Sequence, residues 1–306
     1  MSWKAMLDKL VADYLPDLKM VQDEPMSRHT SFRIGGPAAR MAFPVNAEQI
    51  VLLEGLAETC EIRPTVIGNG TNLLVSDEGI DGLVINTSGM NTIRMEEDGL
   101  TICADAGVSL ARLADFACKQ GLTGLEFAHG IPGTLGGAVC MNAGAYGGEM
   151  KQVIEQVVLM DPEEGIRVLT CEEMQFGYRH SLLDECPQAI VLSASVKLTQ
   201  GDPEAIRATM RELMGKRKAS QPLEWPSAGS TFKRPEGYFA AALIDQCGLK
   251  GLTVGGAQVS EKHAGFVINS GGATCADVLE LMRQVSERVY DEKGVRLEPE
   301  VRIIGK

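Results

Sequence analysis

Two glycine-rich segments contain the residue types that bind phosphate groups through the backbone. The first is VIGNGTNLLVSDEG, from Val66 to Gly79, and the second is HGIPGTLGGAVCMNAGAYGGE, from His129 to Glu149, in which seven residues are glycine. Glycine and asparagine readily adopt positive φ angles, so successive backbone N–H groups can converge on an anion without a cation. Because both segments also carry Asn and Thr and little charge, we expect a ligand site rather than two ordinary turns. The chemistry that they predict is a pyrophosphate held by two separate loops.

The second segment also predicts a short helix that begins after Pro132-Gly133, at Thr134 or its neighbour. The N-terminus of such a helix would face an anion, and Gly136 and Gly137 would let a ligand or another backbone approach closely. Neither segment is a Rossmann fingerprint, because Leu73 occupies the third glycine position of the first segment. The sequence also lacks a GxxxxGKS or GxxxxGKT phosphate loop. The predicted dinucleotide site therefore follows neither of these common patterns.

Composition excludes several classes of function. The net charge of −12 over 306 residues argues against nucleic acid as a partner, since a phosphate backbone is bound by clustered Lys and Arg. The eight cysteines form no CxxC pair and the four histidines show no metal-ligand spacing, so we expect no bound metal. The scattered cysteines indicate free buried thiols in a reducing compartment, and the N-terminal sequence is neither a signal peptide nor a membrane span. We therefore place the protein in the cytoplasm.

Hydrophobic periodicity predicts a mixed order of helices and strands before residue 200. Helices are expected within residues 1–15 and over 47–60, with a third that is capped by Ser109 and ended by Gly121. Residues 21–28 are expected to form a polar connector. Strands are predicted at 65–67, 82–86, 92–95, 101–104, 153–160, 166–169 and 190–198.

The character of the sequence changes at Asp202-Pro203, a pair that suits the start of a helix. A capping-box pattern from Thr274 to Asp277 predicts a long helix that stops at Gly294. We therefore place a domain boundary near residue 200. The remaining predicted elements are helices over 203–218 and around 238–247, short strands near 258 and 266, and a C-terminal strand in LEPEVRIIG.

Six sequence motifs resemble, in the same order, those of the UDP-N-acetylenolpyruvoylglucosamine reductase family. They extend from Ser31 to the C-terminal region, and their combination is far more specific than any one of them. Three resemble the flavin-binding half of that family: SFRIGGPA (31–38), GNGTNLL (68–74) and GIPGTLGGAVCMNAGAYGGE (130–149). The other three resemble its catalytic segments: FGYRHS (176–181), PSAGSTFKRP (226–235) and LEPEVRIIG (297–305).

The resemblance implies an α+β fold, with a vanillyl-alcohol-oxidase/PCMH-type FAD-binding domain of two subdomains and a C-terminal α+β substrate domain. Residues 1–200 would bind FAD, with the subdomains split near residue 90, and residues 201–306 would bind the substrate. The C-terminal strand near 296–306 would bring the catalytic Glu back to the flavin site. The short spacing between Tyr178-Arg179 and the AGS motif resembles the shorter subclass that lacks a substrate-capping tyrosine loop.

The resemblance also implies a flavoenzyme that binds FAD without a covalent link and uses NADPH. It would reduce the enolpyruvyl ether of UDP-N-acetylglucosamine enolpyruvate to UDP-N-acetylmuramate, a peptidoglycan precursor. The partner would be this UDP-sugar, and we expect a monomer with neither nucleic acid nor a membrane span. The residues implied to bind the cofactor are Arg33, Gly68, Asn69, Gly70, Thr71, Asn72, Leu73, Gly130, Gly133, Thr134, Gly136, Gly137, Ala138, Asn142 and Ala143.

Three residues resemble the catalytic residues of the family. Arg179 would grip the substrate carboxylate, on whose side negative charge develops after hydride addition. Ser230 of the AGS motif would donate a proton to the adjacent carbon, and Glu300 would stabilise the intermediate or organise proton delivery. On a strand Glu298 would point to the same face as Glu300. We choose Glu300 because the family pattern places the acid directly before the Val-Arg pair.

The second domain carries further candidates for binding the substrate. Arg217, Gln221 and Lys233 lie near its turn-rich segment and could meet the UDP pyrophosphate, giving local positive charge in an acidic protein. Exposed basic residues at a helix end are an equally good interpretation.

Two other functions stay open on the sequence. An oxidase of the same fold would keep the FAD loops but would not need the YRxS, AGS and LEPEV motifs together. A non-catalytic FAD- or nucleotide-binding regulator would bind flavin and yet fail to oxidise NADPH when the enolpyruvyl sugar nucleotide is present.

Overall fold

Each of two structural units is assembled from three separate stretches of the chain, in a computed structural model that describes residues 2–305. Unit 1 comprises Met1–Gln22, Arg40–Asn69 and Gly82–Lys216, and unit 2 comprises Asp23–Ala39, Gly70–Asp81 and Arg217–Lys306. Two short N-terminal stretches therefore belong with the C-terminal part of the chain. The predicted boundary near residue 200 concerns where FAD binding ends and substrate binding begins, and it stays a prediction.

The first core of unit 1 lies among two helices and a sheet. Helices α1 (Trp3–Tyr14) and α2 (Ala47–Thr59) bury apolar side chains such as Leu7 and Ile50. Both helices are confirmed at the predicted positions. Their apolar residues recur at helical spacing, and Asn46 caps α2. The sheet has the order β1-β2-β5-β3, with bounds β1 (Lys19–Pro25), β2 (Pro37–Phe43), β3 (Thr65–Ile67) and β5 (Ile80–Asn86).

The polar connector predicted over residues 21–28 is wrong. This stretch forms β1 and a short 3-10 helix, Met26–Arg28. Strand β1 lies at the edge of its sheet and has no fully buried residue. Its sequence therefore lacks the alternation of apolar and polar residues by which a half-buried strand is identified.

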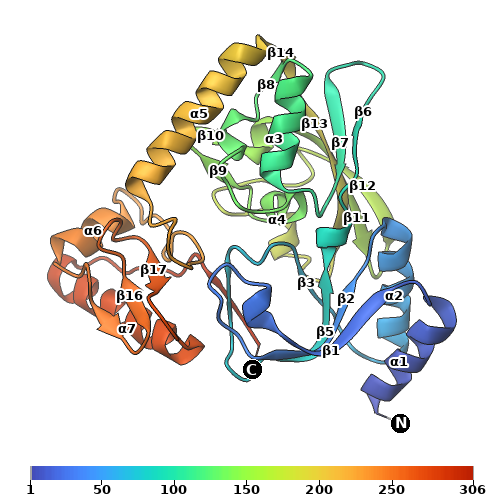
Figure 1. The fold of residues 1–306 in the computed structure, drawn as a ribbon, viewed down its shortest axis with the longest axis horizontal. Coiled ribbons are helices and arrows are strands. Elements are labelled where there is room, and N and C mark those ends of the chain that lie inside the picture. Colours follow the sequence, from blue (N-terminus) through green and yellow to red (C-terminus); the bar gives the residue numbers. More distant parts are fainter. Residues whose placement is uncertain (1, 306) are drawn as a thin grey trace. The chain divides into compact units, whose positions relative to one another are not determined.

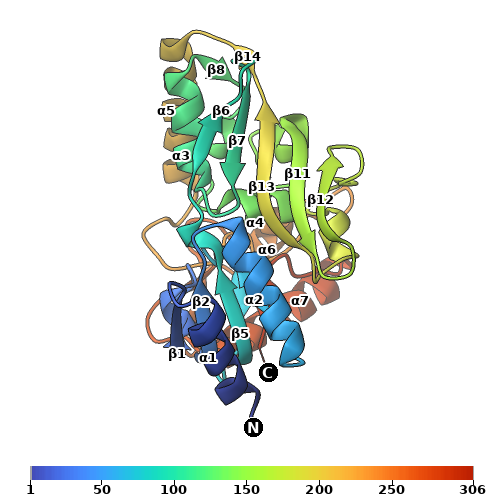
Figure 2. The ribbon, with the colours of Figure 1, turned by 90° about the vertical axis from the view of Figure 1, so that its right-hand side faces the viewer.

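The second core of unit 1 packs against a five-stranded antiparallel sheet of order β12-β11-β13-β7-β6, whose strands lie side by side in Figure 2. Helices α3 (Leu110–Lys119), α4 (Leu135–Cys140) and α5 (Pro203–Ser220) contribute to the same apolar cluster. The predicted strands are confirmed with small shifts at their ends. Their bounds are β6 (Ile93–Met95), β7 (Thr101–Asp105), β11 (Ile154–Asp161), β12 (Gly165–Thr170) and β13 (Ile190–Lys197), and short pairs join β8 (Leu122–Thr123) to β14 (Thr199–Gln200) and β9 (Gly144–Ala145) to β10 (Gly148–Glu149).

Unit 2 has a separate core around helix α7 (Cys275–Lys293), which lies beside β16 and β17 in Figure 1. Val278, Leu281 and Val285 are fully buried on one side of this helix. The predicted capping box is confirmed, since Thr274 and Asp277 accept hydrogen bonds from each other's N–H groups, and Gly294 ends the helix with φ +70°. The other elements are α6 (Ala240–Gln246), the antiparallel sheet β15 (Thr253–Val254), β16 (Ala257–Val259) and β17 (Val267–Asn269), and the parallel pair β4 (Leu73–Val75) and β18 (Arg302–Ile304).

The C-terminal strand is shorter than the sequence predicts. Only Arg302–Ile304 forms β18, and Pro299 before it makes an isolated bridge to Phe232. Proline has no N–H to donate, which limits regular pairing around it. Glu298 and Glu300 both precede β18 and flank the bridged Pro299, where the sequence predicts a continuous strand.

Two expectations from composition can be compared with the structure. The cysteines are free thiols, but only Cys60, Cys118 and Cys275 are buried, so the prediction of buried thiols is right for these three alone. Burial raises the pKa of Cys275 to about 11, which keeps this thiol protonated and unreactive at neutral pH. Within residues 2–305, each helix is too short or too polar to cross a membrane.

Removal of the Thr274 hydroxyl tests the capping box of α7. Thr274→Ala leaves the Asp277 N–H without its acceptor, and we expect the free energy of unfolding to fall by about 1 kcal/mol. Thr209→Ala is the matched control, because that hydroxyl lies exposed on α5 and donates only to the Ala205 carbonyl. Urea unfolding of both variants measures the difference. Equal stability of the two would contradict a capping role.

Candidate active site

The two glycine-rich segments meet in unit 1, although they are far apart in the sequence. Strand β3 ends at Ile67, and the next residue, Gly68, packs directly against the Thr134 side chain, so an added Cβ would collide with Thr134 Oγ1. Asn69 Nδ2 donates a hydrogen bond to the Pro132 carbonyl at 2.9 Å. Glycine is needed at position 68 because of this close approach. The contact places residues 68–69 beside residues 132–134.

Thr134 lies before α4 and is 2% exposed, and its Oγ1 atom has no hydrogen-bond partner within residues 2–305. A buried polar group without a partner costs about 1–3 kcal/mol. The hydroxyl is therefore placed to bond to something that the described chain does not supply. A hydroxyl can donate to a phosphate oxygen, so this uncharged region fits the pyrophosphate of a dinucleotide.

The N-terminus of α4 differs from the prediction that it faces an anion. The N–H groups of Leu135 and Gly136 donate to the carbonyls of Val108 and Ala106, both at 2.8 Å. These two donors are therefore used within the protein, because the start of α4 pairs with the segment before α3. An added Cβ on Gly136 would also lie 2.9 Å from Ala106 Cβ, so this glycine serves close packing. Gly137 is exposed and has room for a ligand beside it.

The other cofactor-binding candidates of the second glycine-rich segment lie along the same loop and helix. The Gly133 carbonyl accepts from Leu110 N at 3.1 Å, and Gly130 is half-buried. Ala138 belongs to the second core of unit 1, and its carbonyl accepts from Ala143 N at 2.8 Å. These residues shape the loop through their backbone, which is consistent with a site built from main-chain groups.

Arg179 lies in a tight turn formed by residues 177–180. The Gly177 N–H donates to the His180 carbonyl at 3.0 Å, and the His180 N–H donates back at 3.3 Å. Arg179 has φ +54°, a left-handed conformation that costs a residue with a Cβ about 1–2 kcal/mol. Its guanidinium carbon lies 5.4 Å from the ring centre of Tyr178. Backbone strain of this kind concentrates at functional sites.

In unit 2, the SFRIGG motif contacts the end of the first glycine-rich loop. The Gly70 carbonyl accepts from Ser31 N at 3.2 Å, and an added Cβ on Gly70 would collide with the His29 carbonyl. Gly70 has φ +60°, so glycine is favoured there on both grounds. Arg33 is exposed with φ +56°, which leaves its guanidinium at the surface of this loop.

Unit 2 also brings Asn72, Ser230 and Glu300 onto adjoining segments. Asn72 Nδ2 donates to the Glu300 carbonyl at 3.0 Å, and the Glu300 N–H donates to the Thr231 carbonyl at 2.8 Å. Glu300 is thus held on both sides of its backbone, next to the residue that follows Ser230. The half-buried residues Thr71 and Leu73 flank Asn72, and Leu73 pairs with Arg302.

The structure distinguishes Glu298 from Glu300. The Glu298 side chain is 74% exposed, and its carboxylate lies 3.6 Å from Lys233 Nζ. The Lys233 N–H also donates to the Glu298 carbonyl at 2.8 Å. Glu298 is therefore the surface ion-pair partner, whereas Glu300 is half-buried. For Lys233 to bind a diphosphate, it would have to leave Glu298.

Among the candidates for substrate binding, Gln221 has a side-chain acceptor that the described chain leaves unsatisfied. Its Oε1 atom is buried and has no hydrogen-bond partner in the described part of the chain. The Gln221 N–H donates to the carbonyl of Arg217, a half-buried residue in the last turn of α5, at 2.9 Å. No cluster of three or more His, Cys, Asp or Glu residues suited to a metal occurs in residues 2–305.

Comparison with protein families defines the class first. Residues 38–170 match the model described as an FAD binding domain, which makes the chain a flavin-binding protein. Residues 221–304 match the model for the C-terminal domain of UDP-N-acetylenolpyruvoylglucosamine reductase. The expected fold, a PCMH-type FAD domain followed by a separate C-terminal domain, is confirmed.

Individual relatives define the family. The chain is 49% identical over 301 residues to a UDP-N-acetylenolpyruvoylglucosamine reductase of Caldanaerobacter subterraneus, with 98% of each chain covered. It is 50% identical to the enzyme of Agathobacter rectalis, with 97% of this chain and 98% of the relative covered. The crystal structure of UDP-N-acetylenolpyruvylglucosamine reductase from Thermus caldophilus superimposes with a TM-score of 0.79 at 38% identity, covering 94% of this chain and 99% of that one. The chain belongs to the UDP-N-acetylenolpyruvoylglucosamine reductase family.

Removal of the unpaired Thr134 hydroxyl should affect the stability of the apo protein and its affinity for FAD differently. Thr134→Val keeps the shape but removes the buried hydroxyl, so the apo protein should unfold with an unchanged or higher free energy. The same variant should bind FAD about fivefold more weakly, the equivalent of one hydrogen bond of about 1 kcal/mol. Flavin titration and urea unfolding measure the two effects, and Thr134→Ser is the control that keeps the hydroxyl. If valine left FAD affinity intact, the hydroxyl would not contact the cofactor.

Proposed function

We infer that the chain reduces the enolpyruvyl ether of UDP-N-acetylglucosamine enolpyruvate to UDP-N-acetylmuramate, with FAD as bound cofactor and NADPH as electron source, in peptidoglycan precursor synthesis. The observation that carries this function is identity of about one half to reductases of this name over nearly the full length of both chains. The contact between the two glycine-rich loops supports the cofactor. The oxidase and the non-catalytic regulator have no comparable support.

The cofactor would be held without a covalent link by backbone-rich loops. When bound, FAD supplies the hydride for the substrate. The FAD-binding region would be residues 1–200, and the substrate-binding region residues 201–306. The proposed cofactor residues are Arg33, Gly68, Asn69, Gly70, Thr71, Asn72, Leu73, Gly130, Gly133, Thr134, Gly136, Gly137, Ala138 and Ala143. Asn142 is not among them, because its side-chain amide bonds within the protein to Lys151, Gly177 and Glu149.

Arg179 would bind the substrate carboxylate. Hydride addition to the conjugated double bond moves negative charge toward this carboxylate, and a fixed guanidinium stabilises that charge with two hydrogen bonds. Arginine suits the task better than lysine because its planar fork matches a carboxylate. The turn of residues 177–180 fixes the backbone from which the guanidinium extends.

Ser230 would donate the proton that completes the reduction. A serine hydroxyl is a weak acid, so it requires close placement and a partner that stabilises proton transfer. Glu300 is proposed as the group that stabilises the intermediate or organises this transfer. The hydrogen bond between the Glu300 N–H and the Thr231 carbonyl supports the pairing, because it ties their two segments together.

Arg217, Gln221 and Lys233 would bind the UDP part of the substrate. The buried, unpaired Oε1 of Gln221 is an acceptor that a ligand donor would satisfy. We further propose a cytoplasmic monomer of the shorter subclass, without nucleic acid as a partner. The free thiols support the cytoplasmic location. The net charge of −12 supports the absence of a nucleic-acid partner.

Two variants test the catalytic roles of Ser230 and Arg179. Ser230→Ala and Arg179→Ala should each retain bound FAD, because neither side chain belongs to the cofactor loops. Turnover should fall by about 10²–10⁴-fold, the range for loss of a general acid or of a charge-stabilising donor. Flavin absorbance and NADPH consumption with the enolpyruvyl sugar nucleotide measure these two properties. Loss of flavin from either variant would make that residue structural.

A matched pair of glutamates tests the third role. Glu300→Gln should lower turnover by at least tenfold, whereas Glu298→Gln should retain it, because Glu298 is exposed and pairs with Lys233. Steady-state NADPH oxidation measures both variants under the same conditions. The assignment fails if the Glu298 variant is the slower of the two.

A further inference from the structure

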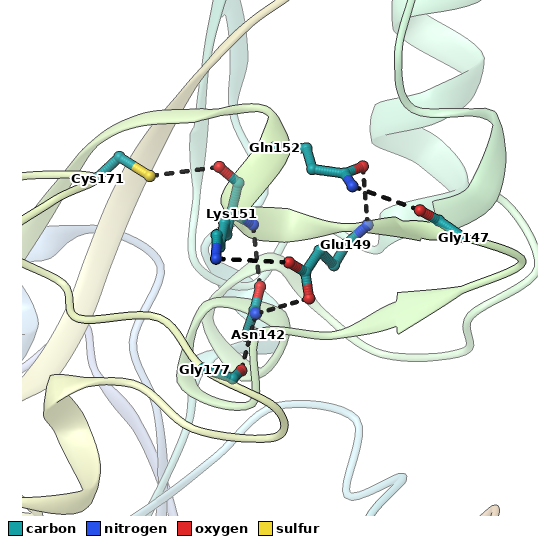
Figure 3. Close-up of polar contacts among 7 residues, drawn as sticks. All are labelled: Asn142, Gly147, Glu149, Lys151, Gln152, Cys171 and Gly177. Atoms are coloured by element: carbon teal, nitrogen blue, oxygen red, sulfur yellow. Dashed lines mark hydrogen bonds and ion pairs between the residues drawn. The ribbon is translucent and has the colours of Figure 1, made fainter.

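We propose that Asn142 is a positioning residue for Arg179, and that it acts through the Gly177 carbonyl. The proposal rests on the proposed function only in that Arg179 binds the substrate carboxylate. It concerns a side chain that joins the glycine-rich segment to the turn of residues 177–180, both within unit 1. Asn142 and its partners Glu149, Lys151 and Gly177 are drawn in Figure 3.

The backbone of Asn142 is fixed by the end of α4. Asn142 has φ +41° and follows the last helical turn, with its N–H on the Val139 carbonyl at 3.2 Å. The next N–H, of Ala143, reaches back to the Ala138 carbonyl at 2.8 Å. This pair of bonds is a Schellman motif, whose left-handed position is usually glycine and sometimes asparagine. Glycine would satisfy the backbone at lower cost, so the asparagine side chain is available for another role.

Asn142 is 1% exposed, and its side chain makes three hydrogen bonds. Its Oδ1 accepts from Lys151 N at 2.9 Å, and its Nδ2 donates to Gly177 O at 2.9 Å and to Glu149 Oε2 at 3.1 Å. The Lys151 N–H can only donate, which fixes the amide with its oxygen toward Lys151 and its nitrogen toward Gly177. Figure 3 shows the amide between these groups. Both donors and the acceptor therefore serve the protein rather than a ligand.

The hydrogen bond to Gly177 acts on the first residue of the turn that carries Arg179. The Gly177 carbonyl also accepts from His180 N at 3.3 Å, so one carbonyl oxygen joins the turn to the Asn142 amide. At the other end, His180 Nδ1 lies 2.8 Å from Asp184 Oδ2. Arg179 has φ +54° between these two restraints. A strained residue stays in place only when its surroundings restrain it, and Asn142 supplies one of the restraints.

The functional consequence follows from the geometry that charge stabilisation needs. A misplacement of about 1 Å in a group that contacts the reacting part of the substrate can cost about 10²-fold in rate. Loss of the Asn142 amide would let the turn shift while Arg179 itself stays present. The defect would then appear in the step that uses Arg179 and not in the reduction of FAD by NADPH.

Asn142→Gly tests the proposal, because glycine accepts the left-handed backbone and removes only the side chain. Stopped-flow absorbance follows the two half-reactions separately. Flavin reduction by NADPH should stay within about twofold of wild type, while reoxidation by the enolpyruvyl sugar nucleotide should slow at least tenfold. Asn142→Asp is a second variant, since it keeps the acceptor for Lys151 but loses both donated bonds. Loss of bound FAD from both variants would overturn the proposal in favour of a purely structural role.

A double-mutant cycle separates positioning from a general loss of stability. In the Arg179→Ala background, Asn142→Gly should slow reoxidation by less than about twofold, because its effect passes through the missing side chain. Additive losses would overturn the proposal. Gln152→Ala is the matched control, since the Gln152 amide bonds to Glu149 N and Gly147 O in the same hairpin and not to the 177–180 turn in the described residues. This control should behave as wild type in both half-reactions.

Amide hydrogen exchange supplies a readout that does not depend on activity. Residues 176–181 should exchange faster in apo Asn142→Gly than in apo wild type or Gln152→Ala, because the Gly177 carbonyl has lost a donor. Unchanged exchange there would overturn the proposal even if turnover fell. Failure of wild-type protein to reoxidise with the enolpyruvyl sugar nucleotide would instead overturn the proposed function, and the exchange result would still decide whether Asn142 restrains the turn.

Discussion

The contact between Gly68 and Thr134 is the constraint on which the proposed dinucleotide site depends. Gly68 follows β3 in the sheet of the first core of unit 1, and Thr134 directly precedes α4, which belongs to the second core. A side chain at position 68 would push these loops apart. Because the protein carries a net charge of −12, its long-range electrostatic field repels a pyrophosphate rather than attracts it. In the proposed site, local donors such as the Thr134 hydroxyl would therefore provide the binding, and the contact between the loops would bring those donors together.

Hydrogen bonds to its backbone also hold Glu300, a proposed catalytic residue of unit 2. The Glu300 carbonyl and N–H bond to Asn72 and Thr231, which belong to two different segments. Pro299 interrupts the strand just before Glu300, and regular pairing begins only at Arg302. Glu300 is therefore fixed by specific contacts instead of a sheet register. This arrangement fixes the backbone from which the Glu300 side chain extends.

The sequence predicts elements well where local chemistry decides the outcome. Helix α2 and the capping box of α7 follow from apolar spacing and from side chains that bond to their own backbone. The sequence does not predict strand β1, because an edge strand without a buried residue has no apolar alternation. The sequence also does not indicate which carbonyls accept the hydrogen bonds of the N–H groups at the start of α4. Their acceptors, Val108 and Ala106, lie in a segment whose proximity depends on tertiary packing.

The same distinction applies to the candidate site. The residue types of the YRHS and AGS motifs indicate a cation and a proton donor, but they do not indicate what fixes them. Asn142 belongs to the glycine-rich motif and was therefore assigned to the cofactor, whereas its amide bonds to Gly177, Glu149 and Lys151. Such a contact joins two motifs that are separate in the sequence. It can be identified only when the folded chain shows which carbonyl lies within reach of the amide.

Strained backbone gives an independent view of where the chain is held for function. Seven non-glycine residues in the described chain have positive φ, and three of them, Arg33, Asn142 and Arg179, are among the proposed site residues. Each such conformation costs about 1–2 kcal/mol for an ordinary side chain and less for asparagine. The chain therefore places the tolerant residue at the end of α4 and the costly one, Arg179, in the turn that the asparagine restrains. If Arg179 binds the substrate as proposed, folding free energy would in this way hold its backbone in place before any substrate arrives.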